Sequence, residues 1–169
     1  MKKSLSAALA ALALTTAAFA NDSTIGNLHI GASDLSLAES SQTSIDVGLQ
    51  FNWEMGSNIY LGFKGDMSFY TPQGNGTFND TTVLMTVLPS LGYKIGDVML
   101  NADVGYALGT IGDAATLSGM VYGAHAEYYI AQEYPIGVGY QTGTLTMSTA
   151  YVDLDQDYSR AYVYIGKRF

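Results

Sequence analysis

The chain has 169 residues, of which 48% are hydrophobic and only 13% are charged, and it contains no cysteine. Its formal net charge is −8, which argues against a nucleic-acid partner because such partners are bound through clusters of basic side chains. A chain of this length has room for one domain of ordinary size, without disulfides, and must either bury a large apolar core or present apolar surface to lipid.

The N-terminus has the pattern of a secretory signal peptide. Lys2 and Lys3 precede an apolar stretch from Leu5 to Leu14, and residues 18–20 read Ala-Phe-Ala, a small-residue cleavage site. The apolar stretch is shorter than the roughly 20 residues that a membrane-spanning helix needs. The sequence therefore predicts a cleaved signal peptide over residues 1–20 and a single mature domain over residues 21–169.

Apolar and polar side chains alternate along residues 44–54, which predicts a strand with one apolar and one polar face. The apolar face holds Ile45, Val47, Leu49, Phe51 and Trp53. Residues 58–70 repeat the pattern after a turn near Gly56.

The same period predicts eight strands in the mature chain. They lie at residues 26–33, 43–54, 58–70, 81–94, 98–108, 117–130, 134–146 and 157–169. Most of them are long enough for a tilted crossing of the hydrocarbon layer, which takes about 9–11 residues. An even number of such strands predicts an all-β fold, an eight-stranded antiparallel transmembrane up-and-down β-barrel.

The predicted connections alternate in length. Short turns are expected near Gly56, Gly96 and Gln132, and longer polar loops at residues 34–42, 71–80, 109–116 and 147–156. This alternation is typical of outer-membrane barrels, whose longer loops face outward. The longer loops carry Asp34, Glu39, Asp80, Asp113, Asp153 and Asp155. They predict an acidic extracellular rim, although charges in a loop are most often there for solvation.

The last predicted strand places Ala161, Val163 and Ile165 on one face and ends at a C-terminal Phe169. Here the sequence resembles the small outer-membrane barrels of the OmpA/OmpX and opacity-protein-like porin type, whose final strand ends in Phe. The resemblance implies a bacterial outer-membrane location, recognition of the final strand by the barrel-assembly machinery, and contact with outer-membrane lipid and lipopolysaccharide. Lys167 departs from the family pattern, which more often has a hydrophobic residue there.

Aromatic residues recur near the ends of the predicted strands, as expected for girdles at the two membrane interfaces. Those near the short turns are Trp53, Tyr93, Tyr128 and Phe169, and those near the longer loops are Phe69 and Tyr106. The alternative is that they are core aromatics of a soluble lipocalin-like barrel. That fold would need a richly charged outer face, which the sequence does not offer.

If the apolar face contacts lipid, the polar face fills the lumen. The predicted lumen charge network consists of Asp46, Lys64, Asp66, Asp103, Glu127 and Arg160. Lys64 and Arg160 are its expected cationic centres and the four carboxylates their partners, because an isolated charge in a poorly hydrated interior is costly. The same face is expected to hold His29, Glu54, Asn101, His125, Gln141 and Arg168.

Two functions follow from this arrangement. The leading hypothesis is a structural or surface-interaction barrel with a plugged lumen, whose acidic loops touch an extracellular ligand. The alternative is a small ion or solute channel. A lipid A-modifying enzyme is less favoured, because His125 and Glu127 lack a nucleophile two residues away. The sequence predicts no cofactor and no metal site, since His29 and His125 are too few to bind a metal.

Overall fold

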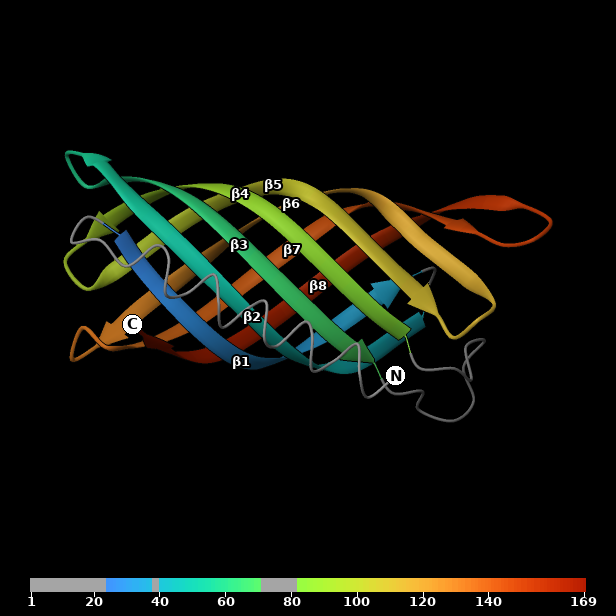
Figure 1. The fold of residues 1–169 in the computed structure, drawn as a ribbon, viewed down its shortest axis with the longest axis horizontal. Coiled ribbons are helices and arrows are strands. Elements are labelled where there is room, and N and C mark those ends of the chain that lie inside the picture. The colour runs from blue at the N-terminus through green and yellow to red at the C-terminus, as the bar shows by residue number, and fades with distance from the viewer. Residues whose placement is uncertain (1–23, 38–39, 71–81) are drawn as a thin grey trace.

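The computed structural model describes residues 24–37, 40–70 and 82–169, which form one closed barrel of eight antiparallel strands (Figure 1). The strands are β1 (Thr24–Leu37), β2 (Ser40–Gly56), β3 (Ile59–Tyr70), β4 (Thr82–Ile95), β5 (Val98–Ile111), β6 (Ala115–Ile130), β7 (Tyr134–Ser148) and β8 (Asp153–Arg168). The predicted fold class is confirmed. The predicted signal peptide, residues 1–20, lies outside the described residues. Within the described ranges, no helix is long and apolar enough to span a membrane.

Each strand pairs with its neighbour in sequence, and β1 pairs with β8 to close the sheet. Following the paired residues once around the barrel from Val163 of β8 leads back to Asp153 of the same strand, ten residues away. With about 3.3 Å per residue and about 4.8 Å between strands, this stagger gives a strand tilt of about 40°. A barrel of eight strands at this tilt has an interior that side chains fill.

We call the two ends of the barrel the turn end and the loop end. The turn end holds the β2–β3, β4–β5 and β6–β7 connections and the C-terminus, and the loop end holds the other connections (Figure 1). Two turn-end connections use left-handed backbone at Ser57 and Asn58 and at Ala131 and Gln132. Consecutive left-handed residues fit the twist of a tight hairpin, which explains why these strands reverse within two or three residues.

Outward side chains form an apolar belt around the barrel. Val104, Val138 and Ile165, from three strands, are all about half exposed. Tyr93 and Tyr128 point outward near the turn end, and Trp53 lies on the same outer face. Above the belt, toward the loop end, the outward positions become polar, among them Asp34, Thr142 and Ser159. The phase of the strands is the one expected of a barrel whose outer face contacts lipid.

Three of the four predicted loops are shorter than expected, because the strands continue through them. β1 runs to Leu37 and β2 begins at Ser40, while residues 112–114 and 149–152 alone separate β5 from β6 and β7 from β8. Asp34, Asp153 and Asp155 therefore lie on strands. The error has a physical reason: at the loop end the alternation reverses, with apolar residues facing inward and polar residues outward. Residues 71–80 and Glu39 lie outside the described residues.

The β7–β8 hairpin extends past the other strands at the loop end, as Figure 1 shows. Its outward positions are polar, with Thr144 and Thr146 on β7 opposite Asp157 and Asp155 on β8. Thr146 Oγ1 donates a hydrogen bond to Asp155 Oδ1 at 2.7 Å. The outward face of this hairpin is polar and stands above the apolar belt, while Tyr151, Val152 and Leu154 at its tip are exposed apolar or aromatic residues.

The C-terminal Phe169 closes the barrel at the turn end. Its backbone N–H donates to the carbonyl of Gly26 on β1 at 3.1 Å. A Cβ atom at Gly26 would collide with the Phe169 ring, so glycine at this position lets the ring lie against the β1 backbone. The ring also meets Phe51 edge-on, with centroids 6.0 Å apart. The terminal aromatic is therefore part of the joint between the first and last strands.

The belt predicts how charges are tolerated on the outer face. Val138→Arg should lower the free energy of unfolding by about 2–4 kcal/mol, because a charged side chain near the membrane midplane loses its hydration. Thr144→Arg is the matched control, six residues along the same outward face but above the belt, and should be nearly neutral. Reversible urea unfolding in lipid vesicles measures both. Equal costs would show that the belt is wrongly placed.

The Phe169 joint predicts an assembly defect. Deleting Phe169 removes both the hydrogen bond to Gly26 and the ring packing, and should lower the amount of heat-modifiable barrel in the outer-membrane fraction several-fold. Phe169→Tyr keeps the ring and should assemble nearly normally. Gel migration with and without heating, on fractionated cells, gives the measurement. Unchanged assembly of the deletion would remove Phe169 from any role in barrel closure.

Candidate functional site

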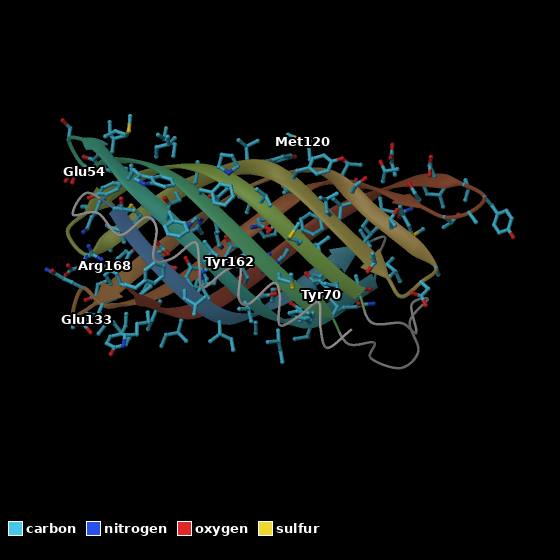
Figure 2. The ribbon with its side chains drawn as sticks, in the orientation of Figure 1. Glu54, Tyr70, Met120, Glu133, Tyr162 and Arg168 are labelled. Carbon is cyan, nitrogen blue, oxygen red and sulfur yellow. The ribbon has the colours of Figure 1, made fainter. Side chains whose placement is uncertain are left out.

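The lumen is layered along the barrel axis. An apolar cap fills the loop end, and below it lies a charge layer made of the six predicted network residues with His29 and His125. Figure 2 shows Tyr70 toward the loop end, Tyr162 midway, and Glu54, Glu133 and Arg168 at the turn end. Every ionisable group of the charge layer is at most 4% exposed. Its charges must therefore be paired or hydrogen-bonded inside the barrel.

Arg160 on β8 is the centre of the charge layer. Its Nη2 lies 3.0 Å from Asp46 Oδ2 on β2, and its Nη1 lies 3.4 Å from Asp66 Oδ2 on β3. Its Nε donates to Ser33 Oγ on β1 at 3.1 Å, and Nη1 also donates to Gln141 Oε1 on β7 at 3.4 Å. The planar guanidinium thus connects five strands, which a lysine ammonium could not do with the same fixed geometry.

Lys64 on β3 occupies a second cationic position. Its Nζ lies 3.3 Å from Asp66 Oδ2. The ammonium also sits over two aromatic faces, 4.0 Å from the ring centroid of Tyr162 and 4.9 Å from that of Tyr164. Cation–π contacts of this kind contribute most when the cation is desolvated, as it is here.

Glycines on β7 make room for these tyrosines. Gly137 and Gly139 pair with Tyr164 and Tyr162 of β8. A Cβ atom at Gly137 would collide with the Tyr164 ring, and one at Gly139 with the Tyr162 ring. The two rings lie against the backbone of these glycines and present their faces to the Lys64 ammonium. The two glycines of β7 therefore provide the space that the tyrosine rings of the charge layer occupy.

Glu127 on β6 is held by neutral donors. The hydroxyl of Tyr164 donates to Oε1 at 2.6 Å and that of Tyr129 to Oε2 at 2.9 Å. The side-chain amides of Asn27 and Gln50 donate to the same two oxygens at 3.4 Å and 3.3 Å. Four donors satisfy this carboxylate without an ion pair. The sequence-based prediction that Glu127 pairs with Lys64 or Arg160 was therefore wrong.

The two histidines bring the remaining carboxylates into the network. His29 Nε2 lies 2.8 Å from Asp66 Oδ1, and His125 Nδ1 lies 2.7 Å from Asp103 Oδ2. Asp103 was also predicted to pair with Lys64 or Arg160, and the structure places it against His125 instead. Both histidines were expected on the lumen face, but their carboxylate partners depend on strand stagger, which the sequence pattern does not specify.

The structure thus brings together four of the six predicted network residues, Asp46, Lys64, Asp66 and Arg160, around one guanidinium. Glu54 and Arg168 were expected in the lumen, but they lie at the turn-end mouth, where Glu54 is exposed (Figure 2). Sequence reasoning missed most of the neutral members of the layer. The missed residues are Asn27, Ser33, Tyr129, Tyr162 and Tyr164, all buried and all on the lumen phase of their strands. The strand pattern does place Gln50, which is also buried, on the lumen face.

The apolar cap was also missed. It consists of Leu35, Leu37, Tyr70, Leu84, Leu88, Ala107, Ile111, Leu117, Val121, Leu145 and Tyr158. Leu117 and Val121 share the phase of Glu127 on β6, and Leu145 that of Gln141 on β7, so the strand phase could have revealed them. The cap lies above the charge layer and fills the loop end of the lumen with close-packed side chains.

The arrangement around Arg160 predicts unequal effects for the two cations. Arg160→Met should destabilise the barrel by about 3–5 kcal/mol, because it leaves Asp46 buried without a cation. Lys64→Met should cost less, since Asp66 keeps Arg160 and His29. Adding Asp46→Asn to Arg160→Met should recover part of the loss. Urea unfolding in vesicles measures all three variants. A larger cost for Lys64→Met than for Arg160→Met would contradict this assignment of the centre.

No family model and no curated protein sequence matches the chain. Solved structures do match its fold. Ail, the attachment invasion locus protein of Yersinia pestis, superimposes with a TM-score of 0.60 at 12% identity, over 86% of this chain and 98% of Ail. Neisserial surface protein A matches with a TM-score of 0.56 at 10% identity, over 87% and 96% of the two chains. The N-terminal barrel domain of Pseudomonas aeruginosa OprF gives 0.51 at 12% identity, over 85% and 97%.

These three matches share the eight-stranded architecture of small outer-membrane barrels. At such low identity they inform on fold alone. The apolar belt and the polar lumen come from this chain's own residues, and they agree with that fold. Fold and belt together are those of an integral outer-membrane β-barrel.

Proposed function

We propose that this eight-stranded outer-membrane barrel is a structural and surface-interaction protein whose lumen is closed. The observation that carries the proposal is the two-layer filling of the lumen. Arg160 and its partners cross the middle of the barrel, and the apolar cap, with Leu84, Leu117 and Leu145 at most 1% exposed, fills the loop end. An ion entering from the loop end would first have to cross packed hydrocarbon, where an unpaired charge is costly.

The channel alternative has less support. A narrow pore would need space beside small lumen residues such as Gly105 and Gly139. A Cβ atom at Gly105 would meet the backbone of Val87 and Leu88, and one at Gly139 would meet the Tyr162 ring. These glycines allow close packing of neighbouring groups instead of lining a passage.

An enzymatic role has no support from the histidines. His125 is 4% exposed and hydrogen-bonded to Asp103 within the lumen. It is therefore turned away from the lipid-facing surface on which a lipid A-modifying site would need it. His29 is likewise buried and hydrogen-bonded to Asp66 in the charge layer. We propose that neither histidine acts in catalysis.

The exposed surface that the proposal relies on is the outward face of the β7–β8 hairpin. Asp153, Asp155 and Asp157 alternate along β8, and Asp155 and Asp157 border a hollow of 820 Å³ together with Thr142 and Thr144 of β7. Within the described part of the chain, the basic side chains that are not buried are Lys94, Lys167 and Arg168, all near the turn end. The loop end thus favours a cationic partner.

One structural relative offers a contrast. A structure of Ail contains sucrose octasulfate, a heparin analogue, with a TM-score of 0.59 to this chain at 12% identity. A polysulfate is strongly anionic, and the three aspartates of the hairpin would repel it. The proposed partner chemistry here is therefore of the opposite sign.

A closed lumen predicts electrical silence. The purified barrel in planar lipid bilayers should show no steady single-channel openings, because ions cannot cross the apolar cap. Replacing Leu84, Leu117 and Leu145 together with serine should loosen the cap and produce at least transient openings. Steady openings of the unmodified protein would favour the channel alternative over the one proposed.

The acidic hairpin predicts salt-sensitive binding of a cationic probe. Barrels in nanodiscs should bind an eight-residue oligolysine peptide, and Asp153→Asn, Asp155→Asn and Asp157→Asn together should weaken binding at least five-fold. The control removes the same number of charges at the turn end, through Glu54→Gln, Asp97→Asn and Glu133→Gln, and should change binding little. Equal losses in both triple variants would mean that the probe senses net charge and no particular face.

A further inference from the structure

The outer face of the barrel carries a groove of 390 Å³ over β2, β3 and β4. Its walls include Val47 and Leu49 of β2, Phe63 and Met67 of β3, and Met85 of β4. Asp66 and Thr86 also border it, but their side chains are buried on the lumen phase, so they reach the groove through their backbone. The side chains that face the groove are therefore apolar.

Gly65 forms the floor of the groove. It sits on the outward phase of β3 between Phe63 and Met67, where neighbouring positions carry large apolar side chains. A Cβ atom there would have no neighbour closer than 4.0 Å, so the space above it is open. Most other strand glycines sit on the lumen phase, where a Cβ atom would collide with a neighbour, as at Gly48 and Gly105. Gly65 is unlike them, because its missing side chain leaves an indentation on the lipid-facing surface.

We propose that this groove binds one acyl chain of a phospholipid from the periplasmic leaflet. The groove is continuous with the apolar belt, so lipid is the medium that meets it. It runs from Trp53, three residues before the end of β2 at the turn end, to Met85, opposite Met67 and Leu108 toward the loop end. This direction follows the barrel axis, as a lipid chain does. Short turns of such barrels face the periplasm, which places the headgroup beside Trp53.

The wall residues suit a flexible apolar occupant. Met67 and Met85 have unbranched, polarisable side chains that adapt to irregular apolar surfaces. Phe63 and Trp53 supply broad faces at the lower half, and Trp53 sits where an indole is expected near headgroups. A second copy of the barrel would need a protruding side chain to fill the indentation. A lipopolysaccharide chain would have to enter from the opposite leaflet, where the groove ends at Met85.

The test uses the protein's single tryptophan as its reporter. The barrel is reconstituted in vesicles of phosphatidylcholine brominated on one acyl chain and then extracted into mild detergent. Native mass spectrometry counts retained phospholipid, and quenching of Trp53 fluorescence reports whether a brominated chain lies in the groove. Gly65→Phe fills the indentation, and Gly65→Leu is a smaller filling variant in case the first folds poorly. Ala124→Phe is the matched control, an outward small residue on β6 that does not line the groove.

The expected result is one retained phospholipid per barrel, with quenched Trp53, in the unmodified protein and in Ala124→Phe. Both Gly65 variants should lose retention and quenching at least five-fold while remaining heat-modifiable. Loss in Ala124→Phe as well, or no retention by the unmodified protein, would overturn the proposal. Dimers that Gly65→Phe abolishes would point to a second copy instead. Retention of lipopolysaccharide in preference to phospholipid, when both are supplied, would overturn the leaflet assignment.

Discussion

The structure depends on pairing and hydrogen-bonding the charged side chains that are buried in the lumen. Asp66 is the shared point of that balance, since Lys64, Arg160 and His29 all reach its carboxylate, at 3.3, 3.4 and 2.8 Å. These groups come from β3, β8 and β1, so the ion pairs span the closure of the barrel. Removing one partner of such a buried set leaves an uncompensated charge, which is far more costly than the pair is stabilising. The stagger of the strands is therefore tied to the charge layer, because a slip of the register would separate these atoms.

The glycines extend this constraint to the backbone. Tyr162 and Tyr164 can lean beneath Lys64 only because Gly139 and Gly137 leave the facing positions of β7 empty. Large lumen residues on one strand thus require small ones on the next. A side chain added at either glycine would displace a ring and, through it, the ammonium of Lys64. The position of the Lys64 ammonium therefore depends on how the neighbouring lumen side chains pack.

Period-two alternation was enough to predict the closed eight-stranded barrel and the lumen phase of Asp46, Asp66 and Arg160. It failed where polarity reversed along a strand. At the loop end the residues still alternate, but apolar residues such as Leu35 face inward and polar residues such as Asp34 face outward. The polar outward residues were therefore interpreted as loop when they lie on strands. The alternation also could not predict which charged residues pair. Those contacts across the lumen depend on the stagger of the strands and on the closure of the barrel. The neutral donors around Glu127 show the limit clearly: nothing in the local pattern tells a carboxylate bound by tyrosines from one bound by a cation.

The reversal of polarity along the strands also separates the two surfaces of the molecule. On the turn-end side of this reversal, outward apolar residues meet lipid and charged side chains face the lumen. Above it, inward apolar residues pack against one another, and the outward face carries carboxylates and hydroxyls, most fully on the β7–β8 hairpin. One strand segment such as residues 153–165 of β8 therefore passes from an acidic exposed face at Asp155 to a lipid-facing one at Val163, while Arg160 between them reaches inward. The apolar cap and the polar face of the hairpin are built from alternate residues on β7 and β8, as Leu145 and Tyr158 face inward while Thr144 and Asp157 face outward. In this barrel the inward side chains become apolar at the height where the outer face turns polar, so the change of face occurs on both sides of the sheet together.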